Sequence, residues 1–129
     1  MRIFLACSIA LFIGVAAVWG VAAQTIDPSS IKEPAATPEV NLGKMSYQAF
    51  CQECHGVNGA GTDKGPPFLN KVYHPGHHGD QSFYIAAKNG ARAHHWKFGD
   101  MKPVPGVSEA QVTHIISYVR ALQKANGIW

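Results

Sequence analysis

The pentapeptide Cys51-Gln52-Glu53-Cys54-His55 constrains this chain more than any other feature. Its C-x-x-C-H pattern is typical of covalent c-type haem attachment. In a helix, two thiols three positions apart lie on one face, so both can add to the vinyl groups of one porphyrin. The imidazole of His55 follows directly and would reach the iron as the proximal ligand. The pattern therefore predicts one covalently bound haem c.

Other uses of the two cysteines are less consistent with the pentapeptide. A bare C-x-x-C would also suit a zinc site or a thioredoxin-like redox pair, but the histidine that follows argues against both. Cys51 and Cys54 could form a disulfide in an oxidising compartment. Thioether linkage to haem is the better interpretation, because it uses both thiols and His55 together.

Residues 1–23 predict an export segment. The run 3–23 carries no charged side chain and ends in Val21-Ala22-Ala23, a small-residue pattern suited to signal peptidase. Cleavage before Gln24 would leave a soluble periplasmic protein, and we favour this alternative. The run is also long enough to span a bilayer uncleaved, as an anchor in the inner membrane. Either way, the rest of the chain would lie on the periplasmic side.

Residues 24–40 predict a flexible linker, because Pro28, Pro34 and Pro38 interrupt a polar sequence. We expect this segment to be extended and mobile, without regular structure. The remaining residues, 41–129, form the predicted domain.

Helical periodicity predicts that this domain is all-α. A first helix is expected from about Leu42 to Cys54, with Asn41 as its N-cap. A middle helix is expected from Gln81 to Asn89, with Asp80 as its N-cap. No alternating strand pattern of any length is present.

The last helix has the clearest signals. It is expected to follow the capping box Ser108-Glu109-Ala110-Gln111 and to end at Asn126-Gly127. Its apolar positions recur at helical spacing and predict the buried face: Val112, Ile115, Ile116, Val119 and Leu122.

Composition limits the partners of this domain. The chain has 11 Lys or Arg and 8 Asp or Glu, and no basic run, so we expect no nucleic-acid surface. About 90 ordered residues make a small core, and such chains often need a covalent staple. A bound haem would provide a large apolar plate around which that core can form.

The order of the motifs resembles class I, monohaem cytochrome c of the bacterial exported type, from about Asn41 to Gln123. The shared order is a helix ending in C-x-x-C-H, a Gly-Pro loop, a middle helix, a methionine-containing loop and a C-terminal helix. The resemblance implies a cytochrome c-like fold of about three main helices around a covalently bound haem. It also implies that the first and last helices cross closely, with Gly43 at the contact near Tyr118.

The resemblance also implies the remaining haem contacts. In Gly65-Pro66-Pro67-Phe68, a proline carbonyl would accept a hydrogen bond from His55 and orient its ring, and we prefer Pro66 to Pro67. Met101 would be the distal iron ligand, and Met/His ligation raises the reduction potential. This chain has Met-Lys-Pro where the family often has Met-Pro-Pro.

These features predict a single-electron carrier whose iron cycles between Fe(III) and Fe(II), with no catalytic residue. It would work as a monomer, or as a subunit of a larger oxidoreductase. Its donor and acceptor would be membrane or periplasmic redox proteins. Four lysines are candidates for a weak, salt-sensitive docking ring, with ordinary solvated surface charge as the alternative: Lys64, Lys71, Lys97 and Lys102.

Seven histidines are many for a chain of this size. They include two clusters, His74-Pro75-Gly76-His77-His78 and His94-His95-Trp96. Three interpretations are open. The clusters could bind copper or zinc, or His94 or His95 could replace Met101 on the iron. The interpretation that we favour is that these histidines bind haem propionates or backbone, or face solvent.

Two other functions follow from these alternatives. A haem with an open or His-exchangeable sixth position would suit a ligand-binding sensor or an enzyme subunit, and its reduced form would bind carbon monoxide. A copper-handling haem protein would retain stoichiometric copper through dialysis.

Overall fold

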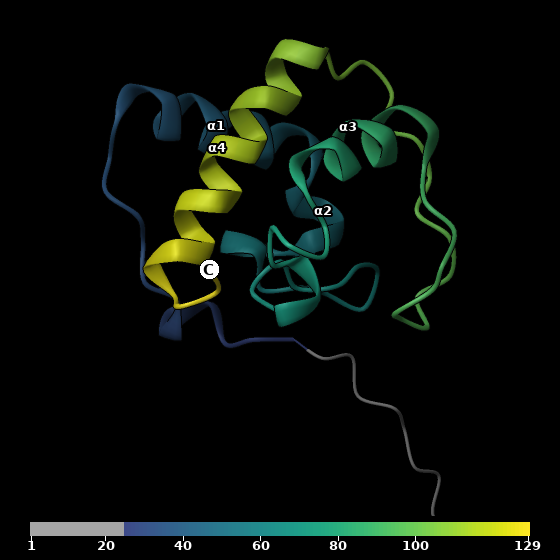
Figure 1. The fold of residues 1–129 in the computed structure, drawn as a ribbon, viewed down its shortest axis with the longest axis horizontal. Coiled ribbons are helices and arrows are strands. Elements are labelled where there is room, and N and C mark those ends of the chain that lie inside the picture. Colours follow the sequence, from purple (N-terminus) through teal and green to yellow (C-terminus); the bar gives the residue numbers. More distant parts are fainter. Residues whose placement is uncertain (1–24) are drawn as a thin grey trace, which may run out of the picture.

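The computed structural model describes residues 25–129, so the export segment expected at residues 1–23 lies outside the described part. The described chain forms four α-helices: α1 (Pro38–Phe50), α2 (Gln52–His55), α3 (Asp80–Asn89) and α4 (Glu109–Ala125) (Figure 1). Three short 3-10 helices connect them: η1 (Pro28–Ser30), η2 (Val57–Gly59) and η3 (Lys71–Tyr73). Residues 25–129 contain no strand, and the all-α prediction is confirmed.

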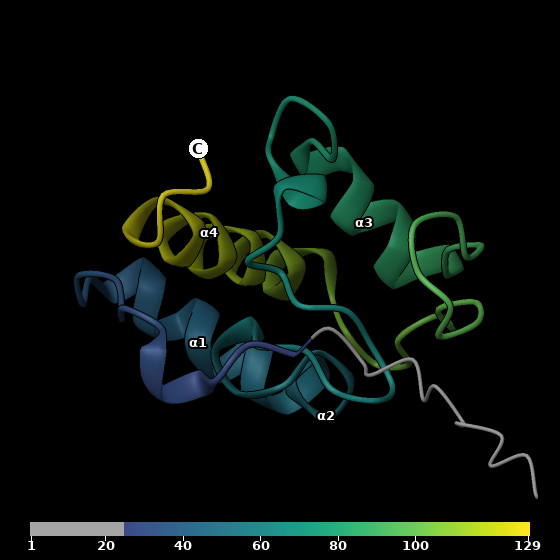
Figure 2. The same ribbon diagram turned by 90° about the horizontal axis from the view of Figure 1, so that it is seen from below.

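Helices α1 and α4 pack closely against each other, and their contact organises the domain (Figures 1 and 2). Gly43 is buried at this contact. A Cβ atom on Gly43 would lie 2.7 Å from the Cβ of Tyr118 and would collide with the backbone carbonyl of His114. The close crossing that the resemblance implied is therefore present, and it requires glycine.

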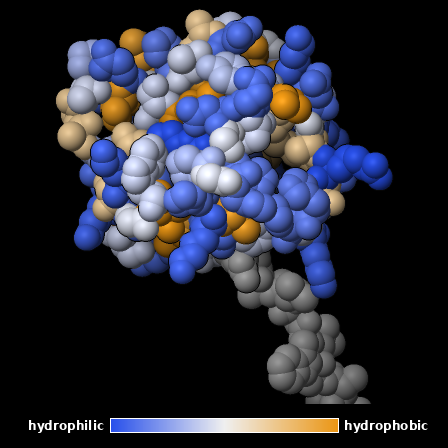
Figure 3. Space-filling model, viewed as in Figure 1, coloured by the Kyte–Doolittle hydropathy of each residue, from blue (hydrophilic) through white to orange (hydrophobic). Residues whose placement is uncertain are grey.

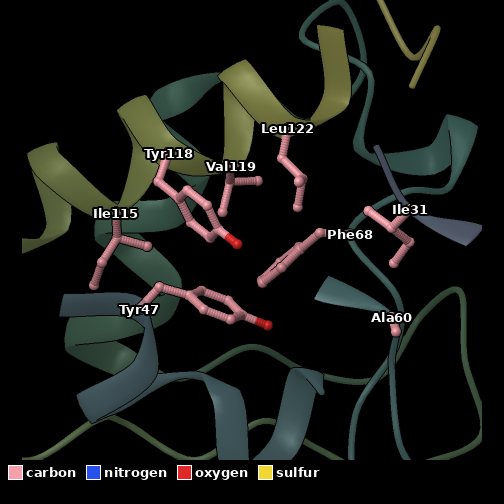
Figure 4. Packing of buried hydrophobic residues seen from close by; sticks show 8 residues of the cluster. All are labelled: Ile31, Tyr47, Ala60, Phe68, Ile115, Tyr118, Val119 and Leu122. Atoms are coloured by element: carbon pink, nitrogen blue, oxygen red, sulfur yellow. The ribbon is translucent and has the colours of Figure 1, made fainter. Parts of the chain in front are cut away.

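The core lies between α1, α4 and the loop that follows α2 (Figure 4). The Phe68 ring of that loop meets Tyr47 of α1 at 6.2 Å between centroids, and Tyr47 meets Tyr118 of α4 at 5.4 Å. The core cluster consists of Ile31, Tyr47, Ala60, Phe68, Ile115, Tyr118, Val119 and Leu122. The five apolar positions predicted for the last helix are all buried.

The beginnings of α3 and α4 differ in how they are capped. At α4 the predicted capping box is confirmed, since Ser108 accepts from the Gln111 backbone and the Gln111 side chain accepts from the Ser108 backbone. At α3 the prediction of Asp80 as N-cap is wrong by one residue, because Gly79 holds that position. The Asp80 carboxylate instead accepts a hydrogen bond from Arg120 of α4 at 2.8 Å.

The first helix also differs from the prediction at both ends. It begins at Pro38 rather than Leu42, and Thr37 rather than Asn41 is the N-cap, with its hydroxyl accepting from the Val40 backbone. Proline is well suited to the first helical position, where no N–H donor is needed. The helix ends at Phe50, because Cys51 leaves helical geometry with φ −122° and separates α1 from α2.

The segment before α1 packs against the domain. Ile31 is buried in the core, and the backbone of Ile26 donates to the carbonyl of Ala60. The Asn126 side chain binds both the N–H and the carbonyl of Lys32, at 2.9 Å each. Regular structure at Pro28–Ser30 and from Pro38 on departs from the irregular chain expected for residues 24–40, whereas residues 31–37 are irregular as expected. The mobility of the segment stays a prediction.

Buried tyrosines should make the fold sensitive to alkali. Burial raises the pKa of Tyr73 and of Tyr118 to about 12, and it also raises the pKa of Tyr47. The unfolded chain releases these protons near pH 10, whereas the folded chain keeps them. The stabilisation is therefore complete below about pH 10 and is lost as the pH rises towards 12. We expect the thermal unfolding midpoint to fall across this window.

Circular dichroism melts of the protein between pH 8 and pH 12 would test this dependence. The Tyr118→Phe variant has one titrating hydroxyl fewer and should lose less stability between pH 10 and 12 than the parent. An unfolding midpoint that stays constant across this window would contradict the prediction.

Candidate haem-attachment site

The pentapeptide keeps a helical hydrogen-bond pattern across the break between α1 and α2. The backbone N–H of His55 donates to the carbonyl of Cys51 at 2.9 Å, and that of Gly56 donates to Gln52 at 2.8 Å. Cys51 is half-buried, Cys54 is exposed, and both thiols are free rather than joined in a disulfide. Burial raises the pKa of Cys51 to about 11, and the charge of Cys54 adds to the effect. Cys51 is thus a neutral thiol at neutral pH, unlike the thiolates that bind metals.

His55 ends α2 with its ring in a defined orientation. Its Nδ1 atom lies 2.9 Å from the carbonyl oxygen of Pro66. Because a carbonyl can only accept, Nδ1 carries the proton and Nε2 has the free lone pair. Within residues 25–129, Nε2 has no hydrogen-bond partner. Burial lowers the pKa of His55, while the bond to Pro66 partly opposes the shift, and the neutral ring is the form that binds a metal ion.

Phe68 contacts the site in a way that sequence reasoning missed. Its ring stacks on the His55 ring, with 4.2 Å between centroids and 19° between planes. It also meets Phe83 of α3 at 5.6 Å. The Gly-Pro-Pro-Phe sequence contained a signal, since a large aromatic residue directly follows the turn that binds His55. Phe68 therefore links the His55 ring to the core.

The loop that follows α2 wraps closely around the pentapeptide. The Thr62 hydroxyl donates to the carbonyl of Cys54 at 2.6 Å, and the Gly61 backbone donates to His55 at 2.7 Å. A Cβ atom at Gly65 would lie 2.8 Å from the Cys54 carbonyl. The glycine-rich sequence thus lets one backbone pass directly against another, and this contact sets the position of Pro66.

Met101 lies in the loop between α3 and α4. Its backbone pairs with Ala91 in an isolated antiparallel bridge, with hydrogen bonds of 2.8 and 3.0 Å. Gly90, with φ 78°, allows the Met101 carbonyl and Pro103 to approach the end of α3. Met101 is half-buried there. These contacts hold the methionine against α3, whereas its role as an iron ligand stays a prediction.

The indole N–H of Trp96 is the one buried side-chain donor or acceptor without a partner in the part of the chain that the structure describes. The Trp96 indole lies near Tyr73 and partly opposes the rise of the Tyr73 pKa, but the indole N–H does not form a hydrogen bond with the Tyr73 side chain. Such an orphaned donor costs about 1–3 kcal/mol. A haem propionate is an acceptor of the kind that the polypeptide does not supply here. The orphaned N–H, the free Nε2 of His55 and the two thiols together fit haem c.

The two histidine clusters meet in space. His77 Nε2 lies 3.1 Å from His95 Nε2, and His78 Nε2 lies 3.4 Å from His94 Nε2. Loss of hydration lowers the pKa of His95, and the nearby His94, His78 and His77 lower it further. His74 differs, because its Nδ1 accepts from the Gly76 backbone at 3.0 Å. The expected contacts with backbone and solvent are present, because His78 and His94 each bind a backbone carbonyl and His77, His94 and His95 are exposed. That interpretation did not include the contact of the imidazoles with each other.

Hydrophilic side chains cover most of the face that Figure 3 shows, with small hydrophobic patches between them. The four lysines expected to assist docking are all exposed. Lys64 forms an ion pair with Glu53 at 2.8 Å, next to the exposed thiol of Cys54. Among residues 25–129, no helix has the length and apolar character needed to span a bilayer.

Comparison with known proteins gives one match. A family model described as cytochrome c matches residues 40–123, which include α1, the pentapeptide, Pro66, Met101 and most of α4. Neither the curated proteins nor the solved structures contain a match.

Proposed function

The chain belongs to the cytochrome c family, whose members are haem-binding electron carriers, and on this basis we propose that it shuttles single electrons between protein redox partners. Haem c supplies an iron that takes up and releases one electron. The observation that carries the proposal is the state of His55, whose Nδ1 is bound by Pro66 and whose Nε2 is free, directly after two free thiols.

Each site residue has a separate role in this proposal. Cys51 and Cys54 would hold the haem through thioether bonds, and His55 would bind its iron. Pro66 fixes the tautomer and the orientation of His55 and makes it a more basic ligand. Met101 would be the second protein ligand, and its neutral, soft thioether would favour the reduced iron and raise the potential. No side chain is assigned an acid–base role.

The compartment and the partners are part of the same proposal. An export segment at residues 1–23 would bring the domain to the periplasm, either released or anchored, as a monomer facing membrane or periplasmic redox proteins. Lys71, Lys97 and Lys102 are exposed and would give weak, salt-sensitive docking. Lys64 would contribute less, because it is already paired with Glu53.

A redox titration of the purified protein, followed by its optical spectrum, tests the proposal. We expect a haem c spectrum and a reversible transition that fits one electron per haem. A purified protein without covalently bound haem would contradict the attachment. A spectrum of five-coordinate iron, or an irreversible transition, would contradict the carrier function and favour the open-site alternative.

The Met101→Ala variant should convert the carrier into a ligand-binding haem protein. With the thioether removed, the reduced form should bind carbon monoxide and the potential should fall, whereas the parent should resist carbon monoxide. The control is Met45→Ala, because Met45 lies on α1 and its side chain is 66% exposed. If Met101→Ala and the parent had the same spectrum, Met101 would not be the ligand.

The imidazoles of His94 and His95 face those of His78 and His77, which favours methionine over either histidine as the second iron ligand.

A further inference from the structure

We propose that His77, His78 and His95 form a second metal site, distinct from the haem iron, for one divalent cation of the copper and zinc class. One ring nitrogen from each of the three residues lies within 4.8 Å of the other two. None of the three belongs to the pentapeptide, to the Gly-Pro loop or to Met101. The site therefore adds a metal-binding function to the proposed electron carrier.

The spacing of the ring nitrogens suits a shared ion. Two imidazole nitrogens bound at about 2.0–2.1 Å to one tetrahedral ion lie about 3.3–3.4 Å apart. His77 Nε2 and His95 Nε2 are 3.1 Å apart, and His78 Nε2 and His94 Nε2 are 3.4 Å apart. Within the proposed group, the His77–His95 pair is already near the required distance, and the His78 nitrogen lies within 4.8 Å of both. His78 therefore has to move closer for the three imidazoles to share one ion, and His94 stands beside His78 as a fourth imidazole at the edge of the site.

The tautomers of His78 and of the neighbouring His94 also favour a cation at this position. His78 Nδ1 lies 2.7 Å from the Val72 carbonyl, and His94 Nδ1 lies 2.7 Å from the Arg92 carbonyl. Both Nδ1 atoms must donate, so in the neutral rings both Nε2 atoms carry lone pairs. Two lone pairs that face each other at 3.4 Å cannot form a hydrogen bond. A cation between them, either an added proton or a metal ion, would attract both lone pairs.

The same two carbonyl contacts are typical of metal-binding histidines. A ligand histidine usually donates its other N–H to a carbonyl or a carboxylate, which orients the ring and raises its basicity. His78 and His94 both have such a partner before any ion is bound. Their rings are therefore oriented for binding by the backbone of the two loops.

Hydrogen bonds hold both loops, within each loop and, for the first, from α4. The backbone N–H groups of His77 and His78 donate to the His74 carbonyl at 2.8 and 2.9 Å, which forms a tight turn. The carbonyl of His78 accepts from the buried Arg120 guanidinium of α4. In the other loop, the Asp100 carboxylate accepts from the Ala93 backbone at 2.9 Å. Ligands on anchored loops can bind without a large ordering cost.

The donor set selects the class of ion. Magnesium and calcium prefer oxygen ligands, and the candidate group contains imidazoles alone. Imidazole suits copper and zinc, and affinity at a nitrogen site rises to Cu²⁺ and falls again at Zn²⁺. Copper should therefore bind more tightly than zinc. His77 and His95 are exposed, so the ion can enter from solvent.

Metal retention by the haem-loaded protein tests the site. The protein is dialysed against a chelator, loaded with copper sulfate or zinc sulfate in separate samples, dialysed again and analysed for copper, zinc and iron. We expect one copper per iron in the parent. The electron paramagnetic resonance spectrum of the bound Cu²⁺ should show hyperfine splitting from nitrogen ligands. Each of His77→Ala, His78→Ala and His95→Ala should weaken copper binding at least tenfold, as measured by titration calorimetry.

The matched control is His114→Ala, which removes an imidazole from α4 outside the cluster and should leave copper binding unchanged. The haem spectrum should be unchanged in all variants, which shows that the fold is intact. The site would be overturned by a parent that retains neither metal, or by a His78→Ala variant that binds copper as the parent does. A changed haem spectrum in His95→Ala would also overturn it, because that imidazole would then belong to the iron. Zinc binding tighter than copper binding would overturn the order of affinity.

Discussion

The Arg120→Ala variant is expected to lose about 3 kcal/mol or more of unfolding free energy. The Arg120 guanidinium is buried on α4 and donates to four acceptors: the Asp80 carboxylate, the Gln123 side chain and the carbonyls of Tyr73 and His78. It also lies over the Phe83 ring, 5.0 Å from the centroid. Alanine would leave the carbonyls and the Gln123 side chain without this donor.

Denaturant unfolding of the haem-loaded protein would measure this loss. Arg92→Ala is the matched control, because Arg92 is exposed and should change stability by less than about 0.5 kcal/mol. Arg120→Lys should restore only part of the loss, since an ammonium group cannot reproduce the planar fork of donors. Equal stability of the Arg120→Ala and Arg92→Ala variants would show that the buried network contributes nothing.

The Gly43→Val variant is expected to destabilise the domain by about 3 kcal/mol or more, because added carbon atoms overpack the crossing of α1 and α4. Even a single Cβ would meet the His114 carbonyl and the Tyr118 side chain, and a backbone carbonyl cannot rotate away as a side chain can. The two helices would have to separate, and the tyrosine contact at 5.4 Å between Tyr47 and Tyr118 would open with them.

Thermal melts would report this change as a fall of the unfolding midpoint of roughly 10 °C or more. Gly43→Ala should show a smaller fall, because the gain in helix propensity offsets part of the strain. Gln48→Ala, at an exposed position of the same helix, is the control and should melt close to the parent. A Gly43→Val protein that melts with the control would mean that the crossing has more room than the structure shows.

Sequence motifs that span only one or two helical turns predicted the local structure well. The capping box at Ser108 and the apolar spacing of α4 both gave a helix with the expected buried face. The boundaries of α1 were less well predicted. Thr37-Pro38 starts a helix by the same local rules, but the surrounding prolines favoured a linker. Cys51 breaks the helix at a residue with no sequence signal for a break.

Contacts between distant residues could not be predicted in this way. Asn126 binds Lys32 across 94 positions, and this contact, together with burial of Ile31, orders a segment that resembles a linker in composition. In the sequence Arg120 resembles one more surface charge on a helix, but two of its acceptors are backbone carbonyls of the segment before α3 and a third is the Asp80 carboxylate of α3. Neither arrangement has a local pattern, because burial depends on which surfaces meet after folding.

The sequence by itself determined the chemistry of haem attachment, since two thiols and an imidazole within five residues need only one turn of helix to face the same cofactor. It also indicated Pro66 and Met101 through the order of motifs. Only the tertiary structure decided that Pro66 binds His55, that Phe68 stacks on that ring, and that the two histidine clusters meet. The physical reason is that α3 separates the two histidine loops along the chain, and only packing brings their imidazoles into contact.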